Sequence, residues 1–426
     1  MEINNEVDYR LAQRIDDIIE YAAQNVPYYI NNFNKKYTYE DNFEVIPFLS
    51  KNQVLNNNET NEFISKDYTK SELVHDRTSG STGKILDIYW NQKDYIRSLM
   101  SLWSKRKICY NILPNSKACY FHSIAYRTYN AESMISSPHI LIKDKGNTLS
   151  LSKLDFSDRM LNIYYNTITK YQPEWVMCHP STLYLFAMYM KENHLEPIQS
   201  IRYVELTGEQ LSQKHREKIE EILHAPTRNE YGAKEFNGIA YECKCGKLHC
   251  LSSNVLVEVI KDGRKARYGE KGEICVTTLN NYAMPLIRYM LGDIGTLYDG
   301  RECKCGDCNP IIVIDAGRSN DVILREDGSY IECVVLYYMI EFINNRCDNI
   351  ISQFQVIQKS LSLCEVRLVL CNVDDIEMKS YVETLFRMKA KEYRLENIEW
   401  IFIYSDRIIP NLKTEKMNYY VKEMTE

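Results

Sequence analysis

One loop of the chain has the composition of a phosphate-binding segment. It reads Arg-Thr-Ser-Gly-Ser-Thr-Gly-Lys over positions 77–84. Glycine lets the backbone approach a ligand and adopt positive φ, while backbone N–H groups, hydroxyls and a lysine donate to anionic oxygens. The usual P-loop is excluded, because it requires Gly where Thr78 stands and Ser or Thr where Ile85 stands. The candidate phosphate-binding residues are Thr78, Ser79, Gly80, Ser81, Thr82, Gly83 and Lys84.

A flexible Ser/Gly linker is the alternative interpretation of this loop. The apolar run over residues 85–90 follows directly and is typical of a strand. A loop that leads straight into a strand favours a ligand-binding turn over a linker.

Two groups of cysteines have the spacing of a metal site. The first is Cys-x-Cys-Gly-x-x-His-Cys over residues 243–250, and the second is Cys-x-Cys-Gly-x-Cys over residues 303–308. Thiolates with one imidazole fit a closed, tetrahedral, structural Zn²⁺ site. Reduced free thiols are the alternative, and an iron–sulfur cluster fits the His and the Cys-x-Cys spacing less well. The seven possible ligands are Cys243, Cys245, His249, Cys250, Cys303, Cys305 and Cys308.

Alternating elements position these motifs. Residues 7–35 have helical apolar spacing, and Ser50 is expected to cap a short helix. From residue 86 to 320, strand-like runs such as 118–121, 175–178 and 203–206 alternate with helical ones, which predicts a largely parallel sheet covered by helices. After residue 321 the strands expected at 354–357, 365–370 and 400–403 and a helix at 375–393 predict a small α+β domain. The predicted domains are therefore residues 1–320 and 321–426.

Further motifs follow in order along the chain. Asn-Glu-Tyr-Gly-Ala-Lys-Glu spans residues 229–235, after Thr-Gly-Glu at 207–209, and Arg-Tyr-Met-Leu-Gly-Asp spans residues 288–293. Together with the phosphate loop, they resemble the adenylate-forming superfamily of acyl-CoA synthetases and adenylation domains. The nearest branch is that of phenylacetate-CoA ligase and the CapK-like proteins.

The resemblance implies an α/β fold, with a large adenylation domain of mixed, largely parallel sheets and a mobile α+β domain at the C-terminus. It also implies a nucleotide site. Tyr231 would stack on adenine, Gly208 and Glu209 would line the same pocket beside Gly232, and Glu235 would bind Mg²⁺. An ionised carboxylate accepts two hydroxyl donors, which suits the ribose-binding role that the family gives to Asp293. Lys234 replaces the family's usual threonine.

The resemblance extends to the hinge and the C-terminus. Arg318, in Asp-Ala-Gly-Arg-Ser-Asn-Asp, would contact ribose or phosphate at the hinge between the domains. Lys416 is the expected catalytic lysine, and Lys413 is the alternative. It would neutralise charge that develops between the carboxylate and the α-phosphate. The family's loop for thiol transfer is altered here, over residues 325–331.

For the zinc site, the resemblance implies Cys243, His249, Cys303 and Cys305 as the ligands. A four-cysteine site that uses Cys245 or Cys308 is the competing set. His122, Tyr126, His179 and Pro180 follow strand-like runs and are candidates for the acyl pocket. No Ser-His-Asp or Cys-His phrase indicates an acyl-enzyme nucleophile.

Composition narrows the partners and the compartment. The formal net charge of the 426 residues is −6, which argues against nucleic acid as the main partner. The polar N-terminus lacks the build of a signal peptide, and no run approaches the roughly 18 apolar residues of a membrane span. We therefore expect a cytoplasmic protein, in which the 14 cysteines do not form disulfides.

The predicted function is ATP- and Mg²⁺-dependent activation of a small-molecule carboxylic acid, with an aromatic acid favoured by the resemblance. The acyl-adenylate would then react with a thiol of CoA or of carrier-protein phosphopantetheine. The first alternative is an acyl-protein synthetase or amide-forming ligase. The second is a degenerate, nucleotide-binding, zinc-stabilised interaction protein. The sequence leaves the exact acid and the oligomeric state open, a homodimer included.

Overall fold

The structure is a computed structural model. It describes residues 2–56, 60–78, 86–122, 140–152, 158–208, 211, 213–318, 322–326, 330–371, 376–393, 395–408 and 419–424. The chain divides into two compact units. The first comprises Met1–Thr78, Ile85–Leu291 and Gly295–Ile314, and the second comprises Asp315–Glu426 with the short pieces Ser79–Lys84 and Gly292–Ile294.

The N-terminal segment forms two helices where the apolar spacing predicted one. These are α1 (Glu2–Asn25) and α2 (Pro27–Asn32). The break follows from Pro27, which has no N–H to continue the first helix but is well suited to the first turn of the second. Ser50 caps α3 (Lys51–Asn56), because its Oγ accepts the Gln53 N–H at 3.3 Å and the Gln53 side chain accepts the Ser50 N–H at 2.8 Å.

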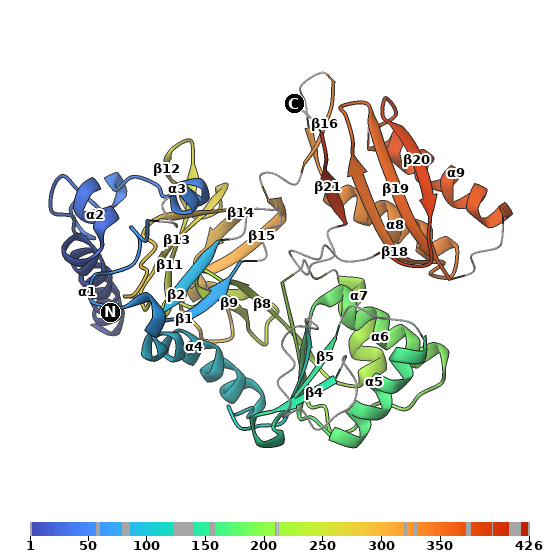
Figure 1. Cartoon of the computed structure of the whole chain (residues 1–426), viewed down its shortest axis with the longest axis horizontal. Helices are drawn as coiled ribbons and strands as arrows, with labels where there is room; N and C mark the ends of the chain where they lie inside the picture. Colours follow the sequence, from blue (N-terminus) through green and yellow to red (C-terminus); the bar gives the residue numbers. More distant parts are fainter. Residues whose placement is uncertain are drawn as a thin grey trace. The chain divides into compact units, whose positions relative to one another are not determined.

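A 13-stranded mixed sheet organises the first unit (Figure 1), and this confirms the expected mixed α/β fold. Parallel pairing is concentrated in the order β5-β3-β6-β7-β8, and β4 and β9 flank this block in antiparallel register. The strands of this region are β3 (Ala118–His122), β4 (Ile140–Lys143), β5 (Thr148–Ser152), β6 (Trp175–Cys178), β7 (Tyr203–Thr207), β8 (Thr227–Ala233) and β9 (Asn237–Glu242).

The large sheet continues beyond β9 with six further strands. Its order continues from β9 as β10-β15-β14-β13-β11-β12. These strands are β10 (Leu248–Cys250), β11 (Val255–Lys261), β12 (Arg264–Lys265), β13 (Lys271–Thr278), β14 (Tyr289–Tyr298) and β15 (Ile311–Arg318). A separate hairpin of β1 (Val74–Arg77) and β2 (Asp87–Trp90) brackets the phosphate loop.

Helices cover both faces of the parallel block. Val204 and Leu206 of β7 pack in a core with α5 (Asp158–Tyr171), α6 (Pro180–Glu192) and α7 (Gln213–Leu223). Tyr203 of the same strand points the other way, into a core with Leu102 of α4 (Gln92–Tyr110). This alternation follows from the two-residue period of a strand.

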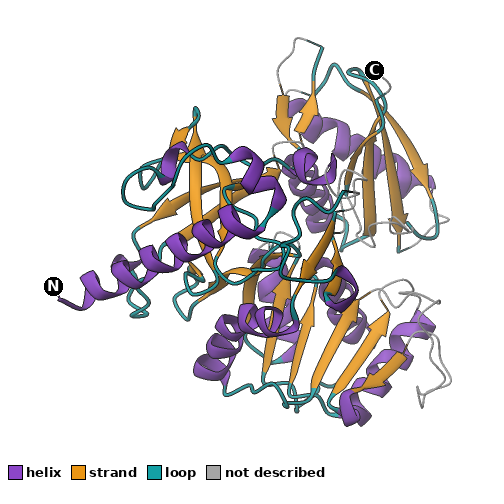
Figure 2. Ribbon diagram, turned by 60° about the vertical axis from the view of Figure 1, so that its left-hand side comes forward, coloured by secondary structure: helices purple, strands orange, loops and turns teal. Residues whose placement is uncertain are grey.

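The second unit contains a four-stranded sheet in the order β20-β19-β18-β21, with α8 (Val334–Arg346) and α9 (Ile376–Glu392) packed against it (Figure 2). The strands are β18 (Ile351–Gln358), β19 (Leu363–Leu370), β20 (Glu399–Tyr404) and β21 (Tyr420–Lys422), with a separate pair of β16 (Val322–Leu324) and β17 (Tyr330–Glu332). Across the described residues, no helix is long and apolar enough to cross a bilayer. None of the 14 cysteines forms a disulfide.

Candidate functional site

The base of the phosphate loop is closed by two hydrogen bonds. The Thr78 N–H donates to the Leu86 carbonyl at 2.9 Å, and the Leu86 N–H donates to the Thr78 hydroxyl at 2.9 Å. Thr78 is therefore buried as part of the hairpin that presents the loop. The other predicted loop residues, Ser79 to Lys84, lie outside the described part of the chain.

The carboxyl ends of β7 and β8 bring two further predicted segments together. Thr207 and Glu230 are the last register partners of this parallel pair, so Gly208 and Tyr231 come directly after the point where the pairing ends. Gly208 has φ +80°, and a Cβ there would meet the ring of His179, with the nearest ring atom 3.0 Å away. Ligands of parallel α/β sheets bind at such strand ends. The predicted Glu209 lies outside the described residues.

Gly232 occupies a space that admits no side chain. A Cβ there would collide with the Glu230 carboxyl and with the Asn237 carbonyl. The position falls next to a bulge in the pairing of β8 with β9. Only glycine fits this approach of two backbone segments, which is the requirement that the motif imposes.

The turn after β8 contains Lys234 and Glu235. Lys234 Nζ lies 3.0 Å from Asp76 Oδ2 in β1, in an ion pair whose lysine side chain is 57% exposed. Glu235 is buried, and its Oε1 accepts the Tyr289 hydroxyl at 3.3 Å. The residue that replaces the family's threonine is thus already paired with the strand that leads into the phosphate loop.

Asp293 is half-buried in β14, one residue after Gly292, which has φ +82°. Arg288, earlier in the same motif, is fully buried. It donates to Glu258 at 3.2 and 3.1 Å and to the Ile46 carbonyl at 2.8 Å, so it holds the segment before α3 against the sheet. The backbone of Arg318 ends β15, and the predicted Lys416 and its alternative Lys413 lie outside the described residues.

A buried polar network, which the sequence reasoning missed, lies between α4 and the parallel strands. Glu205 of β7 is fully buried, and its carboxylate accepts hydrogen bonds from Arg106 Nε at 2.8 Å and Nη2 at 2.5 Å. Tyr203 also donates to Glu205, and Tyr241 of β9 is hydrogen-bonded to the Tyr203 hydroxyl. Burial alone would lower the pKa of Arg106, but the Glu205 carboxylate outweighs burial and raises it.

Glu230 extends this network to the strand ends. Its carboxyl accepts a hydrogen bond from the Thr207 hydroxyl and is 8% exposed. Burial, followed by repulsion from Glu205, raises the pKa of Glu230 to about 7. The only sequence signal was a pair of acidic residues, Glu205 and Glu230, on runs that otherwise read as buried strands.

The two cysteine groups meet in space, although 60 residues separate Cys243 from Cys303. Donor atoms of Cys243, His249, Cys303 and Cys305 all lie within 4.8 Å of one another. The two sulfur atoms of Cys243 and Cys303 are 3.8 Å apart, and Cys305 Sγ lies 3.3 Å from His249 Nε2. A tetrahedral zinc with Zn–S bonds of about 2.3 Å places its sulfur ligands about 3.8 Å apart.

The surroundings of the cluster orient its ligands. The carbonyl of Asn309 accepts from His249 Nδ1 at 2.9 Å, which leaves the lone pair of Nε2 facing the thiols. The backbone N–H of Cys305 lowers the pKa of the Cys303 thiol to about 6. The competing ligands Cys245 and Cys308 are exposed, and Cys250 is buried at the end of β10, one residue after His249. The donor set and its spacing therefore fit a thiolate–imidazole metal site.

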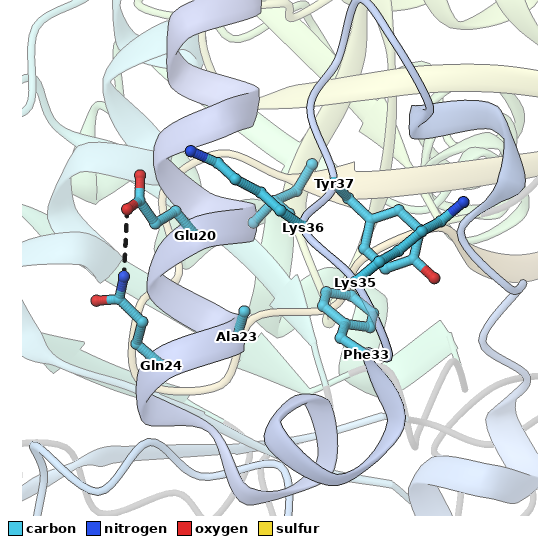
Figure 3. Close-up of a pocket in the computed structure, with 8 residues that line it drawn as sticks. Glu20, Ala23, Gln24, Phe33, Lys35, Lys36 and Tyr37 are labelled. Carbon is cyan, nitrogen blue, oxygen red and sulfur yellow. Dashed lines mark hydrogen bonds between the residues drawn. The ribbon is translucent and has the colours of Figure 1, made fainter.

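A surface cavity of about 240 Å³ lies away from these groups, between α1 and residues 33–37 (Figure 3). Gln24 donates to Glu20 at 3.2 Å on the helix side, and Lys35 extends over the Tyr37 ring on the other. The cavity contains none of the predicted site residues.

Solved structures define the fold class. The chain superposes on 2-hydroxyisobutyryl-CoA ligase bound to an acyl-AMP with a TM-score of 0.73 and 15% identity, covering 98% of this chain and 90% of that one. An anthranilate CoA ligase bound to anthranoyl-AMP matches with a TM-score of 0.54 and 14% identity, covering 83% of this chain and 67% of that one. The chain therefore has the fold of the adenylate-forming ligases.

Sequence relatives then place it within that class. CapK of Staphylococcus aureus is 26% identical over 381 residues, 85% of this chain and 78% of that protein. The phenylacetate-coenzyme A ligase of Escherichia coli is 23% identical over 411 residues, 87% of each chain. No family model matches the sequence. The chain is therefore similar in sequence to CapK and the phenylacetate-CoA ligases, and similar in fold to the adenylate-forming ligases.

Proposed function

We propose that the protein uses ATP and Mg²⁺ to convert a carboxylic acid to an acyl-adenylate and then transfers the acyl group to the thiol of CoA. The observation that carries this proposal is similarity along almost the whole length of a phenylacetate-coenzyme A ligase. It is supported by the shared fold with a ligase bound to an acyl-AMP. An aromatic acid is the proposed substrate class.

The proposed nucleotide site uses the motif residues. Tyr231 stacks on adenine beside Gly208, Glu209 and Gly232. Asp293 accepts the ribose hydroxyls, and Arg318 contacts ribose or phosphate. The loop residues Ser79 to Lys84 bind the phosphates. Glu235 holds Mg²⁺, which would screen the phosphate charge and orient the leaving pyrophosphate.

In the first half-reaction, a carboxylate oxygen attacks the α-phosphorus. The bond from the α-phosphorus to the bridging oxygen breaks, and pyrophosphate leaves. Lys416 neutralises the negative charge that develops between the two reacting groups. In the second half-reaction, a thiolate sulfur attacks the acyl carbon and AMP leaves with the electron pair of the broken C–O bond. The two halves use the two domains, residues 1–320 and 321–426, in turn through a hinge motion.

The acceptor has two further candidates. A carrier-protein phosphopantetheine offers the same thiol as CoA, and a protein side chain or an amine would make the enzyme an acyl-protein or amide ligase. The altered loop over residues 325–331 is an argument for these other acceptors, because in the family that loop serves thiol transfer. AMP release that does not require CoA would identify an acyl-protein or amide ligase.

A degenerate nucleotide-binding protein is the non-enzymatic candidate. The observation in its favour concerns Lys234, which stands where the family has a threonine. Its charge is already balanced by an ion pair with Asp76. Such a protein would bind ATP without forming pyrophosphate.

The deciding experiment is acid-dependent release of pyrophosphate from ATP and Mg²⁺, screened over aryl, arylacetic and fatty acids with no thiol present. A selective hit establishes adenylation and identifies the acid, and adding CoA or a carrier protein then identifies the acceptor. ATP binding with no pyrophosphate from any acid would instead favour the degenerate protein.

The cysteine cluster is proposed to bind one structural zinc ion through Cys243, His249, Cys303 and Cys305. The proposal rests on the sulfur–sulfur distance of 3.8 Å and on the buried, oriented imidazole. Thiolate ligands and 14 cysteines outside disulfides suit a reducing compartment, so we propose that the enzyme is cytoplasmic. A homodimer is a further proposal, which sedimentation of the purified protein tests.

A further inference from the structure

The carboxyl of Glu230 has no assigned role in the reaction, yet it occupies a distinctive place. It lies in β8 where the parallel pairing with β7 ends, one residue before Tyr231, and it accepts a hydrogen bond from Thr207, one residue before Gly208. This side-chain hydrogen bond thus adds to the backbone pairing of β7 and β8 just before the proposed adenine-binding residues. The same carboxyl fills the space that a side chain at Gly232 would need.

Within the described part of the chain, no cation pairs directly with Glu230. The charged groups that face it are Glu205 from β7 and Arg106 from α4. Arg106 is already engaged with Glu205 through two hydrogen bonds, of 2.8 and 2.5 Å. Two buried carboxyl groups therefore share one buried guanidinium, and a second negative charge would be unbalanced.

The other titratable groups nearby do not supply that charge. The hydroxyls of Tyr203 and Tyr241 complete the network of Glu205, from β7 and β9. His179, at the start of α6, packs on Gly208 at the neighbouring strand end. Among the described residues, the carboxyl of Glu230 has one hydrogen-bond partner, the Thr207 hydroxyl, and that group is neutral.

We propose that Glu230 is a positioning residue of the nucleotide site that acts in its uncharged form, bracing the ends of β7 and β8 while ATP is bound. This inference rests on the proposed function, because it takes the adenine site to lie at these strand ends. ATP is a polyanion, so its binding favours the protonated carboxyl over the ionised one. The affinity for ATP then falls as Glu230 loses its proton.

The expected pH range follows from the environment of the carboxyl. Burial and the neighbouring Glu205 raise the pKa of Glu230 to about 7. If only the protonated form binds ATP, the dissociation constant rises about tenfold between pH 6 and pH 8. Over the same range, binding takes up close to one proton at the upper end and almost none at the lower end.

The experiment is calorimetric titration of ATP and Mg²⁺ into the full-length protein at several pH values, each in two buffers of different ionisation enthalpy. ATP itself titrates in this range, so Glu230→Gln is measured alongside and carries the same nucleotide contribution. We expect the ratio of dissociation constants at pH 8 and pH 6 to be about tenfold larger for the wild type. Equal ratios and equal proton uptake in the two proteins would overturn the proposal.

Two further variants keep the test decisive. Glu270 is a partly exposed carboxyl paired with Arg264, and its pKa is lowered to about 2, so Glu270→Gln should keep the wild-type pH dependence. The Thr207 hydroxyl lowers the pKa of Glu230, so Thr207→Val should shift the midpoint of the pH dependence upward, even if Glu230→Gln fails to fold. An unmoved midpoint in folded Thr207→Val would contradict the proposal. Absence of ATP binding at every pH would refute the proposed function instead.

Discussion

Removal of the Arg106 guanidinium tests whether the buried pair with Glu205 holds α4 on the parallel strands. Arg106 is 5% exposed and Glu205 is fully buried, so Arg106→Met leaves a carboxyl among apolar groups with only the Tyr203 hydroxyl as a partner. Breaking a buried pair from one side costs about 3–5 kcal/mol. The guanidinium also lies 4.5 Å from the ring centre of Trp103 and 4.9 Å from that of Trp175, and these contacts are lost too.

The assay is urea unfolding followed by tryptophan fluorescence. Two of the four tryptophans flank Arg106, so their signal reports the unit that contains the mutation, and Trp400→Phe removes the signal of the other unit. We expect the midpoint to fall by an amount equal to about 3–5 kcal/mol divided by the m-value.

Two controls isolate the pair. Arg202 and Glu174 form an exposed ion pair, with side chains 43% and 37% exposed, so Arg202→Met should cost no more than about 1 kcal/mol. The double variant Arg106→Met, Glu205→Leu removes both charges and should recover much of the loss. The reasoning is refuted if Arg106→Met costs as little as Arg202→Met, or if the double variant is no more stable than the single one.

Four other predictions concern the site. Burial raises the pKa of Glu230 from 4.5 to about 7, so the native state holds an extra proton between these pH values and loses stability as pH rises through them. The free energy of unfolding of Glu230→Gln, measured in urea, should therefore rise relative to that of wild type by up to about 3 kcal/mol between pH 4 and pH 8. Cys243→Ser should lower zinc content measured by elemental analysis from about one ion per chain, whereas Cys308→Ser should not, and metal-free wild type would remove the assignment. Asp293→Ala should reduce ATP-dependent pyrophosphate release at least tenfold by weakening ribose binding, and unchanged kinetics would exclude that role. Lys416→Ala should slow acyl-adenylate formation by at least about 100-fold with unchanged circular dichroism, and a normal rate would transfer the role to Lys413.

Local patterns predicted the elements because each element buries a periodic apolar face. The strand expected at 365–370 lies in β19 (Leu363–Leu370), and the helix expected at 375–393 is α9 (Ile376–Glu392). The helix expected over residues 7–35 was wrong in one respect, since the structure ends α1 at Asn25 and begins α2 at Pro27. Propensity and period describe a segment, whereas a proline acts on a single hydrogen bond within it.

The cysteine groups were recognisable because Cys-x-Cys-Gly phrases are rare and their chemistry is specific. The structure brings Cys243, His249, Cys303 and Cys305 together, and it leaves Cys245 and Cys308 exposed. The buried network could not be found in the same way. Arg106 and Glu205 are 99 residues apart, and a basic residue on a polar helix gives no signal that its partner lies in a buried strand.

Helix α4 connects these two parts of the first unit. Lys105 pairs with Asp307, whose backbone N–H donates to Cys305 Sγ at 3.4 Å in the cysteine cluster. The next residue, Arg106, pairs with Glu205 in the strand that leads to Gly208. Adjacent residues of one helix therefore fix it both to the cysteine cluster and to the strand that ends at the proposed nucleotide site. Because Arg106 and Glu205 are both buried, breaking their pair leaves a charge that the surrounding side chains cannot solvate, and this makes the position of α4 costly to change.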